Sequence, residues 1–168
     1  KPHSIDFAVQ VTHDPLRVYV MGERAVYNEP ATEADIAEMQ RLTREALEAG
    51  AVGFSTGRSD VHRSADGEWT PSSEASTGEL AGIARAFDGV GHGVLQAVND
   101  FNLEREGDQF EDEWQVLMEY AKGSNGAPFS LSLMQRDFAP DQWQRIIKAA
   151  EEAKQEGVNI RLQVAPRG

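Results

Sequence analysis

The sequence has 168 residues, of which 28 are Asp or Glu and 16 are Lys or Arg, so its formal net charge is −12 at neutral pH. This excess of acid argues against a nucleic-acid partner or an anionic membrane surface, because phosphate groups would be repelled. A membrane-spanning segment is not expected either, since no run of about 18 apolar residues is present. Cysteine is absent, which excludes disulfides, thiol nucleophiles and thiolate metal sites and favours a cytoplasmic protein.

Both ends of the sequence resemble internal positions of a longer chain. Lys1 is not an initiator Met, and the sequence stops directly after a strand-like stretch at 159–165. We therefore expect a piece of a longer protein.

Apolar periodicity with start and stop residues predicts four helices. In the first helix, Thr32 caps the free amides, Asp35 reaches back as in a capping box, and Gly50 ends the helix. Pro140 suits the first position of the last helix. The four ranges are 32–50, 78–87, 110–123 and 140–157.

Five short stretches between these helices are predicted strands: 5–12, 51–56, 93–98, 129–134 and 159–165. Their alternation with helices indicates right-handed crossovers and parallel strands. We expect an α/β fold, a partial (β/α)₈ barrel of about five parallel strands and four helices, in one domain over residues 1–168. A doubly wound open sheet is the rival fold, although the glycine-rich phosphate turn typical of it is absent after the first strand.

A barrel fragment of this kind has two open sheet edges, at 5–12 and 159–165. We expect apolar residues such as Val9, Phe54, Leu95 and Leu131 to line an inner face that lacks its opposite wall. Exposed apolar surface and unpaired strand edges promote association, so we expect the chain to self-associate.

Candidate site residues follow from the rule that the active face of a parallel barrel lies at the carboxyl ends of its strands. His13 follows the first strand there, although a loop histidine bonded to a backbone carbonyl is an equal alternative. Arg58, His62 and Arg63 come after the second strand, where guanidinium groups can hold a substrate carboxylate. A solvated loop in an acidic protein is the alternative for this group.

Other residues at the same rim are less specific. Ser55 lies in a G-x-S-x-G stretch, but a nucleophile elbow needs an immediate helix, and a long polar loop follows instead. Asp100 or Asp137 could serve as the base of a metal-free enzyme. His3 and His92 precede strands and are expected on the opposite face. No H-x-H or H-E-x-x-H pair is present.

Residues 16–25 (LRVYVMGERA) and 45–57 (EALEAGAVGFSTG), with the capped helix between them, carry a more specific signal. Together they resemble the N-acyl-D-amino-acid deacylases (D-aminoacylases) of the amidohydrolase superfamily. The match continues into Arg58, His62, Arg63 and 66–67, and more weakly into 163–167.

The resemblance implies a zinc-dependent (β/α)₈ hydrolase of which this chain supplies the third to seventh strands. Its metal polarises the substrate carbonyl and activates a water, and an Asp acts as base. The H-x-H pair and that Asp would lie outside the sequence. The family's two further metal histidines correspond to positions near 96–98 and to Leu133, and neither place holds a histidine.

The resemblance thus implies a parent enzyme that hydrolyses the amide of N-acyl-D-amino acids or a related small N-acyl acid through a metal-activated water. His13, Ser55, Arg58, His62 and Arg63 correspond to substrate-binding residues. We expect zinc in the full-length parent, and neither a bound metal nor activity in this fragment. The alternative is a non-catalytic amidohydrolase-like barrel that binds a small anionic ligand or a partner.

Overall fold

The computed structural model describes residues 4–101, 108–137 and 139–164. Five parallel strands form one open sheet in the order β1-β2-β3-β4-β5. The strands are β1 (Val11–Thr12), β2 (Gly53–Arg58), β3 (Val94–Asn99), β4 (Phe129–Leu133) and β5 (Ile160–Val164).

Six α-helices accompany the sheet in the described part of the chain, and a 3₁₀ turn, η1 (Arg85–Phe87), continues the fourth. They are α1 (His13–Met21), α2 (Glu23–Val26), α3 (Glu33–Glu48), α4 (Thr77–Ala84), α5 (Phe110–Gly123) and α6 (Gln142–Gln155). The first two helices were not predicted from the sequence. Gly22 separates them, and Tyr19 and Tyr27 project into solvent, so neither helix has a full apolar face.

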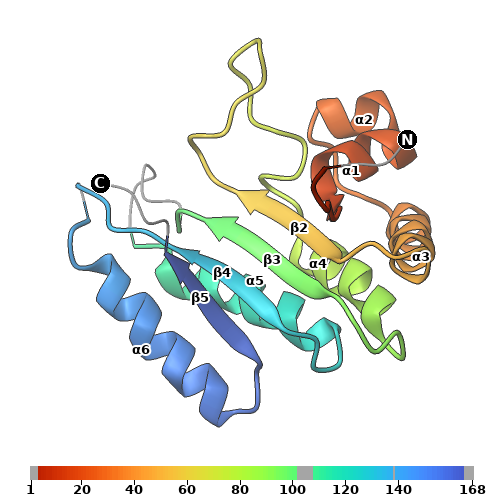
Figure 1. The fold of residues 1–168 in the computed structure, drawn as a ribbon. Coiled ribbons are helices and arrows are strands. Elements are labelled where there is room, and N and C mark those ends of the chain that lie inside the picture. Colours follow the sequence, from red (N-terminus) through yellow and green to blue (C-terminus); the bar gives the residue numbers. More distant parts are fainter. Residues whose placement is uncertain (1–3, 102–107, 138, 165–168) are drawn as a thin grey trace.

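The strand order distinguishes the two predicted folds. In a doubly wound sheet the order reverses at a switch point, which places helices on both faces. Here the order follows the sequence from one edge to the other, so right-handed crossovers bring the helices to a single face. Figure 1 shows α4 and α5 together behind the strands. The α/β prediction is confirmed, and the sheet is consistent with part of a (β/α)₈ barrel.

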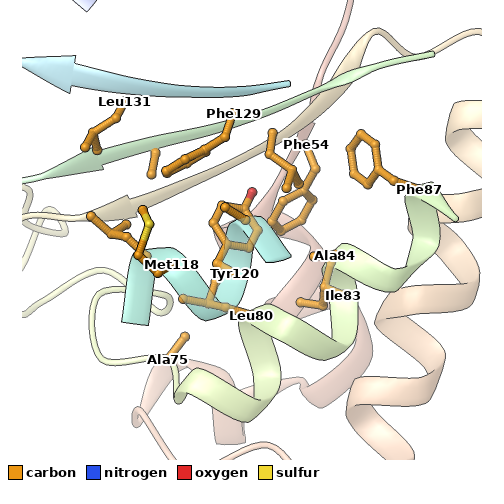
Figure 2. Close-up of a cluster of buried hydrophobic side chains, with 14 of the residues drawn as sticks. Phe54, Ala75, Leu80, Ile83, Ala84, Phe87, Met118, Tyr120, Phe129 and Leu131 are labelled. Carbon is orange, nitrogen blue, oxygen red and sulfur yellow. The ribbon is translucent and has the colours of Figure 1, made fainter. Parts of the chain in front are cut away.

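The core lies between the sheet and these helices (Figure 2). Phe54, Leu95 and Leu131 have no solvent-exposed surface. Tyr120 of α5 lies between two strand residues, with ring centroids 6.3 Å from Phe54 and 5.7 Å from Phe129. The prediction that Phe54, Leu95 and Leu131 line the inner face is therefore wrong, because they point toward the helices.

The opposite face of the sheet is uncovered in the described structure, and apart from Val94 and Val98 its strand positions are polar residues or glycine. Along β3 the side chains alternate between buried and half-buried positions, so Leu95 and Ala97 face the helices and Gln96 and Val98 face away. We call the side that faces away from the helices the open face. Val94 and Val98 are the apolar strand residues of this face, so the apolar surface expected to drive self-association is smaller than predicted. Self-association stays a prediction.

Most predicted boundaries hold to within a few residues. Thr32 and Asp35 form the predicted capping box at the start of α3, and Gly50, just after the helix, has a φ of 107°. Helix α6 begins at Gln142 rather than at Pro140. The first strand is much shorter than the predicted 5–12, although the carbonyl of Val9 still accepts a hydrogen bond from the Val52 amide.

No helix in residues 4–101, 108–137 and 139–164 combines the length and the apolar character needed to cross a bilayer.

Candidate functional site

The carboxyl ends of β1 and β2 meet helix α1 and a long loop, residues 59–76. Figure 1 shows this loop rising beyond the end of β2. His13 is the first residue of α1, Arg58 is the last residue of β2, and His62 and Arg63 lie in the loop. Four of the five predicted site residues are thus at the rim where a parallel barrel carries its chemistry.

His13 belongs to a buried hydrogen-bonded cluster on the helix side of the sheet. Its Nδ1 lies 2.9 Å from Thr56 Oγ1, and its Nε2 lies 3.0 Å from Glu79 Oε1. Arg17 donates from Nε to the same Glu79 oxygen over 2.6 Å. All four residues are buried, and the imidazole also packs on Phe54 with ring centroids 5.3 Å apart. His13 is therefore bonded to two side chains rather than to a backbone carbonyl.

Glu79 is an anion in this cluster. Burial by itself raises the pKa of its carboxyl group, but hydrogen bonds and positive charge from His13 and Arg17 more than offset that effect and lower the pKa overall. Its second oxygen, Oε2, is shielded from solvent and has no hydrogen-bond partner among the described residues. The cluster holds β2, α1 and α4 together around one carboxylate.

Thr56, His13 and Glu79 present a hydroxyl, an imidazole and a carboxylate in the order that can activate a nucleophile. The Thr56 side chain points into the core, however, and the residue is only 4% exposed. A substrate carbonyl cannot reach this hydroxyl. We therefore assign the cluster a structural role beneath the rim.

Arg58 forms a second buried cluster with Glu113 of α5. Its Nε and one terminal nitrogen donate to the two Glu113 oxygens over 2.9 and 2.8 Å, and the other terminal nitrogen donates to the Ala75 carbonyl over 2.7 Å. Asn99 donates to the same carboxylate over 2.8 Å. Since the guanidinium fork is occupied by protein acceptors, it does not face a substrate in this arrangement.

These clusters also fix the second half of the loop. Arg17 donates to the carbonyl of Pro71 over 2.6 Å, and the carboxylate of Asp14 accepts from the Ser72 amide over 2.6 Å. Together with the hydrogen bond from Arg58 to the Ala75 carbonyl, these contacts link residues 71–75 to α1 and β2. The loop is therefore anchored on its α4 side, and its tip projects.

The exposed tip carries the remaining predicted residues of the loop. His62 lies beside the end of the open face, because a Cβ placed on Gly57 would be 3.6 Å from its Nδ1. The guanidinium carbon of Arg63 lies 5.1 Å from the centre of the Trp69 ring, a cation–π contact. Ser55 is half-buried and lies on the open face, opposite Gln96.

The five predicted residues thus occupy three places: two in buried clusters facing the helices, one on the open face, and two at the loop tip. Sequence reasoning missed Arg17, Glu79 and Glu113. A signal existed, because Glu113 shares a helix face with Phe110 and Leu117, where the periodicity calls for an apolar residue. A charge at such a position indicates a buried ion pair.

The two candidate bases differ in their surroundings. Asp100 is buried, and its Oδ2 accepts from the Asp60 amide over 2.5 Å. The preceding Asn99 accepts from the Phe101 amide, so the pair shapes the turn after β3, which is the commoner use of such residues. Asp137 is exposed.

The described residues do not fit the zinc centre that the resemblance implies. Within them, no three His, Asp or Glu side chains gather where they could hold a metal ion. Both ring nitrogens of His13 already have partners. Leu133, at one expected histidine position, packs against the hydrophobic core, and Gln96, near the other, lies on the open face.

A cavity of about 340 Å³ opens at the opposite end of the sheet, between the loops that precede β3 and β4. Phe87, His92 and Asn125 contribute to its lining. His92 donates from Nε2 to the Leu47 carbonyl over 3.0 Å. The prediction that His92 lies on the face away from the active rim is confirmed.

Two relatives match the chain in sequence. An N-acyl-D-glutamate deacylase from Alcaligenes xylosoxydans xylosoxydans is 28% identical over 165 residues, which cover 96% of the chain and 30% of the relative. A D-aminoacylase from the same organism is 31% identical over 98 residues, covering 58% of the chain and 17% of that relative. No protein-family profile and no solved structure matches. The chain thus spans less than a third of either relative, and the predicted resemblance is confirmed: its sequence is that of a segment similar to the N-acyl-D-amino-acid deacylases.

Proposed function

We propose that the complete protein hydrolyses the amide bond of N-acyl-D-amino acids or of a related small N-acyl acid. The observation that carries the proposal is the similarity to an N-acyl-D-glutamate deacylase over 96% of the chain. The sequential parallel sheet agrees with it, since the resemblance implies a (β/α)₈ barrel and this strand order is what such a barrel requires.

In this proposal the described residues supply scaffold and substrate surface. The Glu79 and Glu113 clusters fix the end of β2 against α1, α4 and α5. The open face and the tip of the 59–76 loop remain accessible to a ligand. The zinc ion implied by the resemblance would polarise the scissile carbonyl, and its ligands would come from outside the described residues.

A non-catalytic barrel that binds a small anionic ligand or a partner is the second candidate. It is favoured by Leu133 and Gln96, which stand near the places where the resemblance calls for histidines. The two candidates share the same fold and differ only in turnover.

The test uses the purified full-length protein. Release of free amino acid from a set of N-acetyl-D-amino acids would be measured, with the L-enantiomers as the control, together with the zinc content of the protein. Stereoselective release supports the proposal. Saturable binding of these compounds without release supports the non-catalytic candidate. If the protein neither binds nor hydrolyses them, both candidate functions are contradicted.

A further inference from the structure

The open face carries a row of polar side chains that crosses all five strands. The strand register places Thr12 opposite Ser55, Ser55 opposite Gln96, Gln96 opposite Ser130, and Ser130 opposite Arg161. Partners in a parallel register point to the same side of the sheet. The interiors of such barrels are normally dominated by branched apolar residues, so an entirely polar row is unusual.

The next row toward the carboxyl rim is half polar. It contains Gly57 opposite Val98 and Ser132 opposite Gln163. Ser130 and Gln163 are linked by a hydrogen bond of 3.2 Å between Oγ and Oε1. The hydroxyl oxygen of Ser132 is shielded from solvent and has no hydrogen-bond partner among the described residues. The two rows together offer neutral donors and acceptors in a small area.

Arg161 is the one charged strand residue on the open face of the described sheet. One terminal nitrogen of its guanidinium donates a hydrogen bond to the carbonyl of the neighbouring Ile160, over 3.0 Å. In contrast, Arg17 and Arg58 each have a glutamate partner within 2.8 Å. A guanidinium enclosed in a barrel interior needs an anion, because an unpaired buried charge is strongly disfavoured.

We propose that Arg161 binds the carboxylate of a small N-acyl amino acid held against the open face. The planar fork matches a carboxylate with two parallel hydrogen bonds, and the neighbouring Ser130, Gln163 and Gln96 suit the neutral amide of the same molecule. The positive charge also attracts an anionic ligand to a protein whose net charge of −12 would repel it.

This inference rests on the proposed function and assigns its substrate anchor. Arg161 takes the place of Arg58 and Arg63, the arginines predicted from the sequence to bind the substrate carboxylate. Arg58 is committed to Glu113 and Ala75, and Arg63 stacks on Trp69 at the loop tip. Arg161 alone among these three combines an open-face position with a guanidinium that no described acidic residue pairs.

The experiment compares two substrates in the full-length protein, N-acetyl-D-leucine and its neutral analogue N-acetyl-D-leucinamide. Both contain the same scissile bond, and only the first has the carboxylate. Wild type, Arg161→Gln and Arg161→Lys would be assayed for KM and kcat. Arg85→Gln is the matched control, because Arg85 is exposed in η1, away from the open face.

Arg161→Gln is expected to raise KM for N-acetyl-D-leucine by about 30-fold or more, the effect of losing one partner of a buried charge pair. It should leave KM for the amide and both kcat values within about twofold. Arg161→Lys should recover part of the loss, since the charge remains and the fork is lost. Arg85→Gln should behave as wild type.

An unchanged preference for the carboxylate substrate in Arg161→Gln would overturn the inference while leaving the proposed function intact. Equal losses for both substrates would also overturn it, because they would indicate a structural role, for example pairing with an acidic residue of the complete barrel. No turnover of either substrate by the wild type would instead contradict the proposed function. Titration of N-acetyl-D-leucine into wild type and Arg161→Gln would then test the inference by binding alone, and equal affinities would overturn it.

Discussion

Nε2 of His13 lies 3.0 Å from Oε1 of Glu79, a residue 66 positions further along the chain. The same oxygen accepts a hydrogen bond from Arg17. One carboxylate therefore joins the first and fourth helices at the rim of the sheet, in a place that solvent does not reach. Removing its charge tests whether the cluster is a structural unit.

Glu79→Gln is expected to lower the free energy of unfolding by about 3 kcal/mol at neutral pH, because it leaves the buried Arg17 without its counter-charge. Urea denaturation measures this change. Glu45→Gln is the matched control: Glu45 pairs with Arg41 on the surface of α3, and its loss should barely move the midpoint. Equal midpoints for Glu79→Gln and the control would contradict the structural role of the cluster.

The Glu79 cluster also predicts a pH dependence. Since the pKa of Glu79 is lower in the folded protein than its ordinary value of 4.5, its contribution to stability is complete above that value. The contribution is lost as the pH falls through the lower pKa of the folded state. The stability difference between wild type and Glu79→Gln should therefore be constant above about pH 5.5 and shrink in more acidic solution. Urea titrations from pH 7 to pH 3 would show it, and a constant difference throughout would contradict it.

Local signals were sufficient to predict much of the fold. The capping box at Thr32 and Asp35 and the glycine after α3 act within a few residues of one another, so the sequence displays them directly. Helix α1 was missed because its buried residues are mixed: His13 and Arg17 share its inner side with Leu16 and Met21. A periodicity of apolar residues alone does not show such a helix.

The site was less predictable because its contacts join distant parts of the chain. Arg58 and Glu113 are 55 positions apart, and nothing near Arg58 in sequence shows that its fork is occupied. The rule that active-site residues follow the carboxyl ends of parallel strands placed Arg58 correctly at the end of a strand. It could not tell to which face of the sheet the side chain points. Strand alternation, once the register is known, assigns Arg58 to the helix side and Arg161 to the open face.

Arg58→Lys is expected to reduce stability by about 2 kcal/mol, since a lysine cannot reproduce the paired hydrogen bonds to Glu113 and also reach Ala75. Arg63→Lys, at the exposed loop tip, should change stability by less than about 1 kcal/mol. Denaturation of both variants measures the contrast. A large rise in KM for Arg58→Lys with unchanged stability would instead support the predicted role in substrate binding.

Tyr120→Phe is expected to improve resistance to alkali. Burial raises the pKa of the Tyr120 phenol well above its ordinary value of 10.0, so the folded state loses stability as the pH rises past the value in the unfolded chain. The hydroxyl lies 3.5 Å from the Gln96 carbonyl, a weak contact, so little should change at neutral pH. Tyr19→Phe, in an exposed position, is the control. Identical alkaline unfolding curves for Tyr120→Phe and wild type would contradict this prediction.

Two glycine-to-alanine substitutions should change stability in opposite directions. Helices α4 and α5 approach each other closely at Gly123, where an added Cβ would lie 2.7 Å from the Ala81 carbonyl oxygen and 3.2 Å from the Ala84 Cβ. Backbone atoms cannot move aside as a flexible side chain can, so Gly123→Ala should lower the free energy of unfolding by about 1–3 kcal/mol by forcing the helices apart.

Gly78, the matched control, is exposed in α4, and the nearest neighbour of an added Cβ would be Ser76 Oγ at 4.0 Å. Gly78→Ala should stabilise the protein by about 0.5 kcal/mol, because alanine restricts the unfolded chain and favours the helix. Urea midpoints would therefore fall for Gly123→Ala and rise slightly for Gly78→Ala; a fall of similar size in both would mean that the close contact of α4 with α5 does not determine the cost.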